Sequence, residues 1–501
     1  MNLAEILIHT ASVRPARAAL RLGDGVVDYA ELNEASGRVA SLLGTYGVAA
    51  GDRVGVMLPN VPEFAAIYYG VLRAGGVVVP MNPLLKTREI EFYLGDSGAR
   101  LVFAWQPAAD EVRAAAQRLP GVEAVIVAPS GFVAELLSYE PSDLLVQRSP
   151  DDTAVILYTS GTTGRPKGAE LTHDNLTRNA EVTQSDLVRL SADDVVFGGL
   201  PLFHSFGQTV TLNTTVAAGA TLVMLPRFDA RTALALMAEH AVTVFAGVPT
   251  MYSAFLAVDD APALPRLRLC LSGGAALPVE VLRQFEDRFG CAILEGYGLS
   301  ETSPVASFNL VDQRKPGSIG TPVTGVEMRV VDLDGNPLPT GEVGEIAIRG
   351  HNVMKGYWRR PDATAAVLSA DGWFRTGDVG RVDGDGFYVI VDRMKDLIIR
   401  GGFNVYPREI EEVLYEHPDV AEAAVIGLPH DRLGEEVGAA VALRPGSTTT
   451  ETELREYVRG QVAAYKYPRV VWFVESLPKG PTGKILKREI VAPSDPPAGV
   501  Q

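Results

Sequence analysis

The chain has 501 residues, of which 47% are hydrophobic and 21% charged, and its formal net charge at pH 7 is −16. A chain of this length can bury more than one core and is expected to form at least two domains, which excludes a small disulfide-stabilised scaffold. The acidic balance excludes a nucleic-acid-binding surface, which needs clustered Lys and Arg. With only Cys270 and Cys291 and seven His, neither a disulfide framework nor a zinc cluster is expected.

No targeting segment is expected at the start of the chain. Residues 1–20 carry charged side chains among the apolar ones, unlike the continuous apolar core of a signal peptide. Apolar runs elsewhere, such as 75–81, are shorter than the ~20 residues that span a bilayer. We therefore expect a cytoplasmic protein with no integral membrane segment, and leave peripheral membrane association open.

The first part of the chain alternates helical and strand patterns. Asp28 and Glu31 form a capping-box pattern before a helix, residues 54–58 resemble a strand, 62–74 a helix opened by Pro62, and 77–80 a strand. Strand patterns recur at 242–245 and 267–271. This alternation predicts a layered α/β domain with parallel strands.

The pattern changes after about residue 310, where turn pairs separate short apolar runs at 334–335, 371–372 and 383–386. They predict β-hairpins. The DGDG sequence at 383–386 lacks the third acidic position and the closing Glu of an EF-hand loop, so we interpret it as a hairpin turn.

From about Asp392, a helix opening at Pro407, a strand at 423–426 and a helix capped by Thr450 and Glu453 predict a compact α+β domain. Residues 492–501 contain three Pro and no periodicity and are expected to be a disordered tail.

A loop suited to phosphate binding follows the predicted strand at 154–158. Glycines, hydroxyls and a lysine within ten residues allow backbone N–H groups and hydroxyl donors to converge on a polyphosphate while Lys167 balances its charge. Pro166 stands where the Walker pattern needs its second Gly and Lys, which disfavours a P-loop NTPase. The candidate ligands are Thr159, Ser160, Gly161, Thr162, Thr163, Gly164 and Lys167.

Five motifs in order resemble the adenylate-forming acyl-CoA synthetase superfamily, most closely its bacterial medium- and long-chain fatty acyl-CoA ligases. They are YTSGTTGRPKG (158–168), GYGLSET (296–302), TGD (376–378), DRMK (392–395) and PTGKIL (481–486). The resemblance implies a large N-terminal domain (1–391) of layered α/β subdomains with a small β-barrel-like part, and a small mobile α+β domain (392–491). It also implies two half-reactions: a carboxylate and ATP give acyl-AMP and pyrophosphate, and CoA then displaces AMP.

The resemblance assigns roles to individual residues. Lys484 is expected to stabilise charge in the first half-reaction, Glu301 to bind the Mg²⁺ of ATP, and His204 to act as a further catalytic residue. As a point charge on a long stem, Lys484 can reach both the attacking carboxylate and the α-phosphate. Besides the loop above and Lys484, the expected ATP- and AMP-binding residues are Gly274, Ala275, Glu295, Gly296, Tyr297, Gly298, Ser300, Asp378 and Arg393.

The resemblance also places a hinge at Lys395. Rotation there would move Lys484 out of the active site and bring in a loop that lines the CoA tunnel. This loop consists of Arg400, Gly401, Gly402 and Phe403. ATP, Mg²⁺ and CoA are thus the expected cofactor and co-substrates.

The segment 200–209 (LPLFHSFGQT) matches the family's acyl-pocket loop. Amino-acid-activating relatives carry Asp at the position of His204, and residues 205–218 contain no Lys or Arg for a dicarboxylate, so both substrate classes are disfavoured. The expected lining, mostly apolar or small, favours a medium- or long-chain fatty acid: His204, Phe206, Gly207, Val248, Gly273, Gly274 and Gly298.

Several alternatives stay open. An aromatic acid would fit the same surfaces. An acyl-AMP ligase that loads a carrier protein is disfavoured, because no extra segment lies between Asp378 and Lys395. A non-catalytic binding protein of the same fold is disfavoured because Lys484, Glu301 and Lys167 are all present. A monomer and a homodimer are equally compatible with the sequence.

Overall fold

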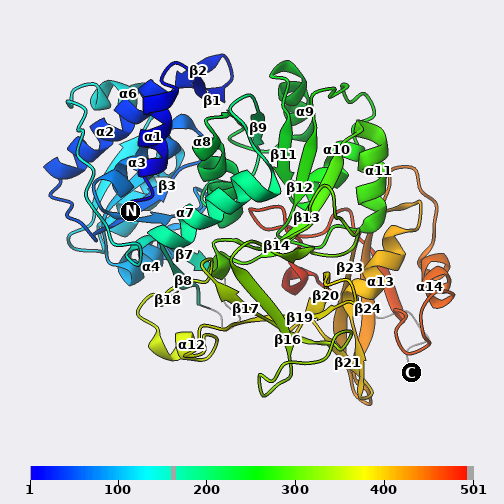
Figure 1. Cartoon of the computed structure of the whole chain (residues 1–501). Coiled ribbons are helices and arrows are strands. Elements are labelled where there is room, and N and C mark those ends of the chain that lie inside the picture. The colour runs from blue at the N-terminus through cyan, green and yellow to red at the C-terminus, as the bar shows by residue number, and fades with distance from the viewer. Residues whose placement is uncertain (1, 160–164, 494–501) are drawn as a thin grey trace.

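The computed structural model describes residues 2–159 and 165–493 and contains a large N-terminal domain and a small C-terminal one, as predicted. Two helix-covered sheets stand side by side in the large domain, with a smaller sheet and the small domain beneath them (Figure 1). Among the described residues, no helix combines the length and apolarity needed to cross a membrane.

The first large sheet has seven strands in the order β18-β8-β7-β4-β3-β5-β6. Its central neighbours pair in parallel, and only β7–β8 and β8–β18 are antiparallel. The bounds are β3 (Arg53–Met57), β4 (Val77–Pro80), β5 (Ala99–Trp105), β6 (Glu123–Val127), β7 (Thr153–Thr159), β8 (Lys167–Thr172) and β18 (Gly356–Tyr357).

The second large sheet has nine strands in the order β15-β14-β13-β12-β11-β9-β10-β1-β2. It is parallel from β13 to β1, and the residues of β10, β11 and β12 are buried, as expected for strands covered on both faces. The bounds are β1 (Ala18–Leu22), β2 (Gly25–Asp28), β9 (Val195–Gly198), β10 (Thr221–Met224), β11 (Val244–Gly247), β12 (Leu269–Ser272), β13 (Ala292–Gly298), β14 (Val305–Phe308) and β15 (Thr321–Pro322).

The helices of the large domain begin where their local signals predict. Asp28 and Glu31 form the predicted capping box of α2, and Pro62 occupies the first turn of α3. The bounds are α1 (Glu5–Val13), α2 (Tyr29–Thr45), α3 (Pro62–Arg73), α4 (Thr87–Ser97), α5 (Ala109–Ala116), α6 (Pro129–Leu136), α7 (His173–Val182), α8 (Thr214–Ala218), α9 (Ala230–Glu239), α10 (Pro249–Leu256), α11 (Val279–Phe289) and α12 (Pro361–Ala365).

The part expected to resemble a β-barrel is an antiparallel sheet of β16 (Val326–Val331), β17 (Gly344–Gly350), β19 (Phe374–Val382) and β20 (Tyr388–Arg393). Within the described residues its outer strands β16 and β20 do not pair with each other, so the sheet is open rather than a closed barrel. Four strands are too few to curl into a ring with room for side chains. Asp383 and Asp385 form the predicted hairpin turn between β19 and β20, and both carboxylates contact Lys315.

The small domain has a sheet in the order β22-β21-β24-β23, with β25 also paired to β24. Helix α13 buries Ile410 and Leu414, and α14 buries Leu454 and Val458, at the four-residue spacing of a helix face that packs on a sheet. The bounds are β21 (Ile398–Arg400), β22 (Phe403–Val405), α13 (Pro407–Tyr415), β23 (Val420–His430), β24 (Gly434–Leu443), α14 (Glu451–Arg459) and β25 (Val470–Phe473). The boundary predicted at residue 392 falls near the end of β20 and stays a prediction.

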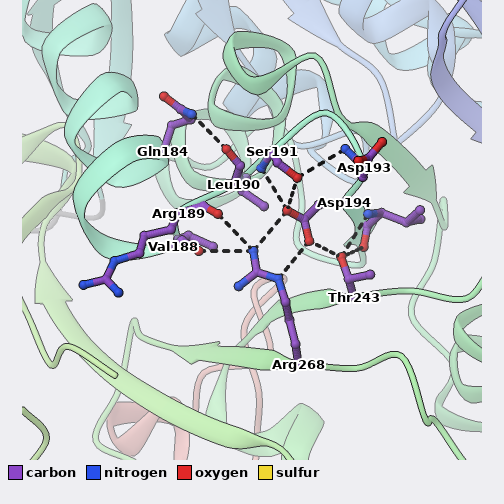
Figure 2. A network of polar contacts seen from close by, with 10 residues as sticks. Gln184, Val188, Arg189, Leu190, Ser191, Asp193, Asp194, Thr243 and Arg268 are labelled. Carbon is purple, nitrogen blue, oxygen red and sulfur yellow. Dashed lines mark hydrogen bonds and ion pairs between the residues drawn. The ribbon is translucent and has the colours of Figure 1, made fainter. Parts of the chain in front are cut away.

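A buried polar network ties together the amino ends of β9, β11 and β12 (Figure 2). Asp194 accepts hydrogen bonds from Arg268 Nε (2.8 Å), Thr243 Oγ1 (2.7 Å) and the Ser191 amide (2.9 Å). Burial alone would raise the pKa of Asp194, but these hydrogen bonds outweigh it and hold the pKa below its usual value. The network lies at the amino ends of these strands, whereas ligands of such sheets bind beyond the carboxyl ends, so we interpret it as structural.

Replacing Asp194 by Asn is expected to lower the free energy of unfolding by about 2 kcal/mol at pH 7. This is less than for a fully buried ion pair, because the Arg268 side chain is 39% exposed. A lowered folded-state pKa stabilises above the unfolded pKa of about 4 and loses this effect as pH falls further, so the deficit should shrink below about pH 4. Urea unfolding midpoints measure it, and Asp193→Asn, at a 92% exposed neighbour, is the control. A deficit independent of pH would contradict the ionic role.

Candidate active site

The predicted site residues of the large domain gather beyond the carboxyl ends of the parallel strands β9, β11, β12 and β13, where open α/β sheets bind ligands. His204 follows β9, Val248 follows β11, Gly273 to Ala275 follow β12, and Tyr297 lies at the end of β13. Because the strands run parallel, these three loops and the end of β13 meet at one edge of the sheet.

Tyr297, Asp378 and Arg393 form one polar group. The Tyr297 hydroxyl donates to Asp378 Oδ2 (2.6 Å), and Arg393 Nε lies 3.3 Å from Asp378 Oδ1. Asp378 and Arg393 are directly opposite each other on the antiparallel strands β19 and β20, which fixes this pairing. Burial, with the Asp378 carboxylate, raises the pKa of Tyr297, so its hydroxyl keeps its proton. The group brings together the residues expected at the ribose and the base.

Glu301 lies in a short 3₁₀ turn, opened by Ser300, that follows β13, and it is buried. Its Oε1 accepts a hydrogen bond from the Tyr357 hydroxyl (2.9 Å), and the Thr159 hydroxyl lies 3.4 Å away. Lys167 Nζ sits 5.1 Å from the centre of the Tyr357 ring. Carboxylate and hydroxyl oxygens near a lysine fit a magnesium–phosphate ligand. Tyr357 was missed by the sequence reasoning, because no motif marks it and only the pairing of β18 with β8 brings it here.

The phosphate loop joins the antiparallel strands β7 and β8, with Thr159 paired to Lys167. A Walker loop instead joins a strand to a helix, so this topology agrees with the exclusion of a P-loop NTPase. Ser160, Gly161, Thr162, Thr163 and Gly164 lie outside the described residues.

The turn after β12 carries Gly274 with a φ of +79°, a left-handed conformation that favours glycine. The buried Glu295 of β13 holds this turn, because its Oε1 accepts from the Leu277 amide (3.1 Å). Burial raises the pKa of Glu295 to about 7. The structure therefore places the Glu295 side chain as a support of the turn that carries Gly274 and Ala275.

The expected acyl-pocket residues lie together. A Cβ on Gly273 would approach the Phe206 ring to 3.3 Å, and one on Gly274 would lie 3.5 Å from Val248. Three other glycines are required by packing, since a Cβ would overlap protein atoms at Gly207, Gly296 and Gly298. Their glycine identity is thus explained without a ligand.

His204 and Lys484 share this site. His204 Nδ1 accepts from the Phe206 amide (3.3 Å), and burial, with the Lys484 ammonium, lowers the pKa of His204 to about 4, so its ring is neutral at pH 7. Gly483 is held by the Thr250 hydroxyl, which donates to its carbonyl (2.9 Å). The C-terminal segment, red in Figure 1, reaches back beneath β12 and β13. The small domain thus stands in an orientation that brings Lys484 to the large domain's site.

The residues expected at the CoA tunnel lie elsewhere. Arg400 pairs with Glu436 (2.5 Å), and Phe403 is 58% exposed and packs near Tyr465. A Cβ on Gly402 would meet nothing within 4 Å. The tip of the β21–β22 hairpin, residues 401–404, is therefore exposed in this orientation, whereas Ile398 and Val405 at its base are buried. Lys395 lies in the exposed turn just before the hairpin.

A family model for the AMP-binding enzyme matches residues 7–358, and one for the AMP-binding enzyme C-terminal domain matches residues 409–484. The chain belongs to the AMP-binding enzyme family. The matched ranges contain Glu301 and Tyr297 in the first model and Lys484 in the second.

Relatives of this AMP-binding enzyme align over nearly its whole length. A long-chain-fatty-acid–CoA ligase of Bacillus subtilis is 37% identical, covering 98% of this chain and 94% of the relative. A feruloyl-CoA synthase of an Amycolatopsis species is 40% identical, covering 96% and 97%. The crystal structure of ATP-bound MatB from Rhodopseudomonas palustris is 37% identical, with a TM-score of 0.91 over 97% of this chain and 98% of that one; for apo MatB the TM-score is 0.82. The predicted acyl-CoA synthetase activity, with ATP, Mg²⁺ and CoA, is thereby confirmed.

Proposed function

We propose that this acyl-CoA synthetase activates a medium- or long-chain fatty acid as acyl-AMP and then transfers the acyl group to CoA. The main support for this assignment is that Lys484, from the small domain, lies near His204, Asp378 and Arg393 of the site. The higher TM-score to ATP-bound than to apo MatB supports an orientation suited to the first half-reaction. The domain boundary, the hinge at Lys395, the cytoplasmic location and the oligomeric state stay predictions.

In the first half-reaction, an oxygen of the fatty acid carboxylate attacks the α-phosphorus of ATP, and the bond from that phosphorus to the pyrophosphate oxygen breaks. Negative charge on the α-phosphate oxygens increases in the transition state. The Lys484 ammonium would neutralise this charge and hold the attacking carboxylate beside it. Asp378 and Arg393 would orient the ribose, and the phosphate loop, with Lys167, would hold the β- and γ-phosphates.

Glu301 is the residue that would hold Mg²⁺, since its carboxylate is buried and kept in place by Tyr357 and Thr159. When bound, Mg²⁺ neutralises phosphate charge and orients the pyrophosphate leaving group. Burial raises the pKa of Tyr357, so the tyrosine donates a proton in its hydrogen bond and keeps Glu301 available as an anion.

The acyl-chain assignment depends on apolar and small residues. Phe206 faces Gly273, Val248 lies beside Gly274, and residues 205–218 contain no Lys or Arg to pair with a second carboxylate. The B. subtilis relative, named for long-chain fatty acids, supports the same class. A neutral His204 also avoids placing a buried charge next to an apolar chain.

A second candidate is an aromatic acid with a polar substituent. Helix η3 (Phe206–Asn213) begins next to His204, and the side-chain oxygens of its buried Gln208 (Oε1), Thr209 and Thr211 have no hydrogen-bond partner among the described residues. A buried polar atom without a partner costs about 1–3 kcal/mol, and a hydroxyl on a substrate could satisfy one. The relative named feruloyl-CoA synthase favours the same alternative.

Release of AMP and pyrophosphate with a panel of acids tests the proposal. The panel runs from acetate through hexanoate, dodecanoate and octadecanoate to benzoate, coumarate and ferulate, each with and without CoA. Peak turnover on an aliphatic acid of medium or long chain, dependent on CoA, is expected. A peak on aromatic acids would move the assignment to an aryl-CoA ligase. Acyl-AMP that accumulates unchanged by CoA would indicate a carrier-protein acceptor instead.

Replacing Gly402 by Leu is expected to slow thioester formation about a hundredfold while acyl-AMP formation changes less than about twofold. A side chain there would block a tunnel that forms only after the small domain rotates, and a blocked approach misplaces the thiol. The matched control is Gly386→Leu, because Gly402 and Gly386 have φ of +85° and +86° and both face open space. If both variants slowed thioester formation equally, the effect of Gly402→Leu would come from backbone strain and not from a blocked tunnel.

A further inference from the structure

The turn between β12 and α11 is held by two carboxylates that come from different domains. Glu295 Oε1, from β13 of the large domain, accepts from the Leu277 amide (3.1 Å). Glu412 Oε2, from α13 of the small domain, accepts from the Val279 amide (3.3 Å). Between the two amides lies only Pro278, which has no N–H to donate. A single short turn therefore connects the predicted adenine-binding residues to the small domain.

Val279 is the first residue of α11, so the carboxylate of Glu412 lies at the amino end of this helix. The first N–H groups of a helix lack partners within it, and its dipole favours a negative charge there. Helix α11 has no capping side chain of its own, because Pro278 stands at the N-cap. Glu412 thus supplies from the small domain the cap that the large domain's helix lacks.

Neighbouring contacts hold Glu412 in this position. Arg408, one helical turn earlier on α13, lies 3.7 Å from Glu412, and its guanidinium donates to the carbonyl of Ile390 in β20 (2.7 Å). Burial raises the pKa of Glu412, while Arg408 and the Val279 amide act against this rise. The carboxylate is therefore partly removed from water and relies on these two protein contacts.

We propose that Glu412 is a positioning residue that caps helix α11 and thereby holds the small domain in the orientation that brings Lys484 to the acyl-AMP-forming site. This inference rests on the proposed role of Lys484. The small domain also docks through the Thr250 hydroxyl and the Gly483 carbonyl, close to Lys484 itself. Glu412 adds an attachment at the amino end of α11, and its neighbour Arg408 adds a hydrogen bond to the Ile390 carbonyl of β20. The orientation is therefore held on α10, α11 and β20 together rather than at Thr250 alone.

The cap also links the small domain to the nucleotide. The turn that Glu412 and Glu295 hold begins at Gly273 and Gly274, where the base is expected to pack. When the small domain rotates for the CoA step, Glu412 leaves and the first turn of α11 loses its cap. The two half-reactions should therefore respond differently to the loss of Glu412, since only the first needs the capped orientation.

The test compares Glu412→Ala and Glu412→Gln with Glu416→Ala, which removes the same charge from an exposed site one turn later along the chain. Pyrophosphate release measures acyl-AMP formation, and thioester formation from supplied acyl-AMP and CoA measures the second step. Glu412→Ala should lower the first about tenfold, the effect of losing a charge-assisted hydrogen bond. Glu412→Gln should lower it less, because the amide oxygen still accepts. The second step should be unchanged or faster, and Glu416→Ala should change neither.

Hydrogen–deuterium exchange of the peptide that contains Val279 provides a readout that does not need activity. Exchange should be faster in Glu412→Ala than in the parent chain and unchanged in Glu416→Ala. Equal loss of both half-reactions, or unchanged exchange in Glu412→Ala, would overturn the proposal. A parent chain that releases no pyrophosphate with any acid would refute the proposed function instead, and the exchange measurement would still decide whether Glu412 caps α11.

Discussion

Acyl-AMP formation is expected to fall about a thousandfold when Lys484 is replaced by Ala, whereas thioester formation from supplied acyl-AMP and CoA should stay within about twofold of the parent. Removing one group that stabilises transition-state charge typically costs 10²–10³ in rate. The second half-reaction should not need Lys484, because rotation of the small domain is expected to carry Lys484 away from the site before CoA displaces AMP. Pyrophosphate release and thioester absorbance measure the two steps separately.

The control for Lys484 is Lys479→Ala, which removes a lysine from the same C-terminal segment, where it contacts Glu422 rather than the site. This control should leave both half-reactions within about twofold of the parent, as expected for a surface ion pair. Equal loss of both half-reactions in Lys484→Ala would contradict the division of labour between the two orientations.

The same lysine predicts a pH dependence. Burial and the Arg393 guanidinium, opposed by Asp378, lower the pKa of Lys484 from its usual value to about 8. The ammonium form therefore predominates below about pH 8 and is lost above it, so kcat/KM for acyl-AMP formation should decrease as pH rises through about 8. Lys484→Arg keeps its charge and should lack this decrease, whatever its absolute rate. An identical decrease in Lys484→Arg would assign it to another group.

The second large effect is expected from Glu301→Gln, which should lower acyl-AMP formation about a hundredfold or more at fixed Mg²⁺. A carboxamide offers one neutral oxygen in place of an anionic pair, so the site should bind Mg²⁺ more weakly. Titration with Mg²⁺ should show a higher half-saturating concentration and partial recovery at high Mg²⁺.

Tyr357→Phe is the matched control for Glu301, because it removes the hydrogen bond to Oε1 and leaves the carboxylate in place. We expect about a tenfold loss or less, the value of one hydrogen bond to a charged group. A Glu301→Gln variant with normal Mg²⁺ dependence would contradict the metal role, and a Tyr357→Phe variant equal to Glu301→Gln would shift that role toward the tyrosine.

Much of the fold follows from local signals in the sequence. The capping boxes at Asp28 and Thr450 begin α2 and α14, and Pro407 opens α13, because hydrogen bonds within a few residues decide where a helix starts. The parallel strands were predicted from alternating patterns, and strand β4 has the predicted bounds. The predicted barrel-like part is instead an open sheet of four strands. Its shape could not be predicted, because strand pairing across a sheet depends on contacts between distant residues.

The family and the chemical groups of the site follow from the sequence alone, since its motifs contain the residues and their order along the chain. The three-dimensional structure was needed to show that Tyr357 contacts Glu301, that Glu295 supports a turn, and that Glu412 lies at the amino end of α11. These contacts join residues 18 to 133 positions apart. The orientation of the small domain, which places Lys484 in the site, likewise depends on a few contacts between domains. A motif encodes which groups are present, but contacts between distant segments depend on how the whole chain packs.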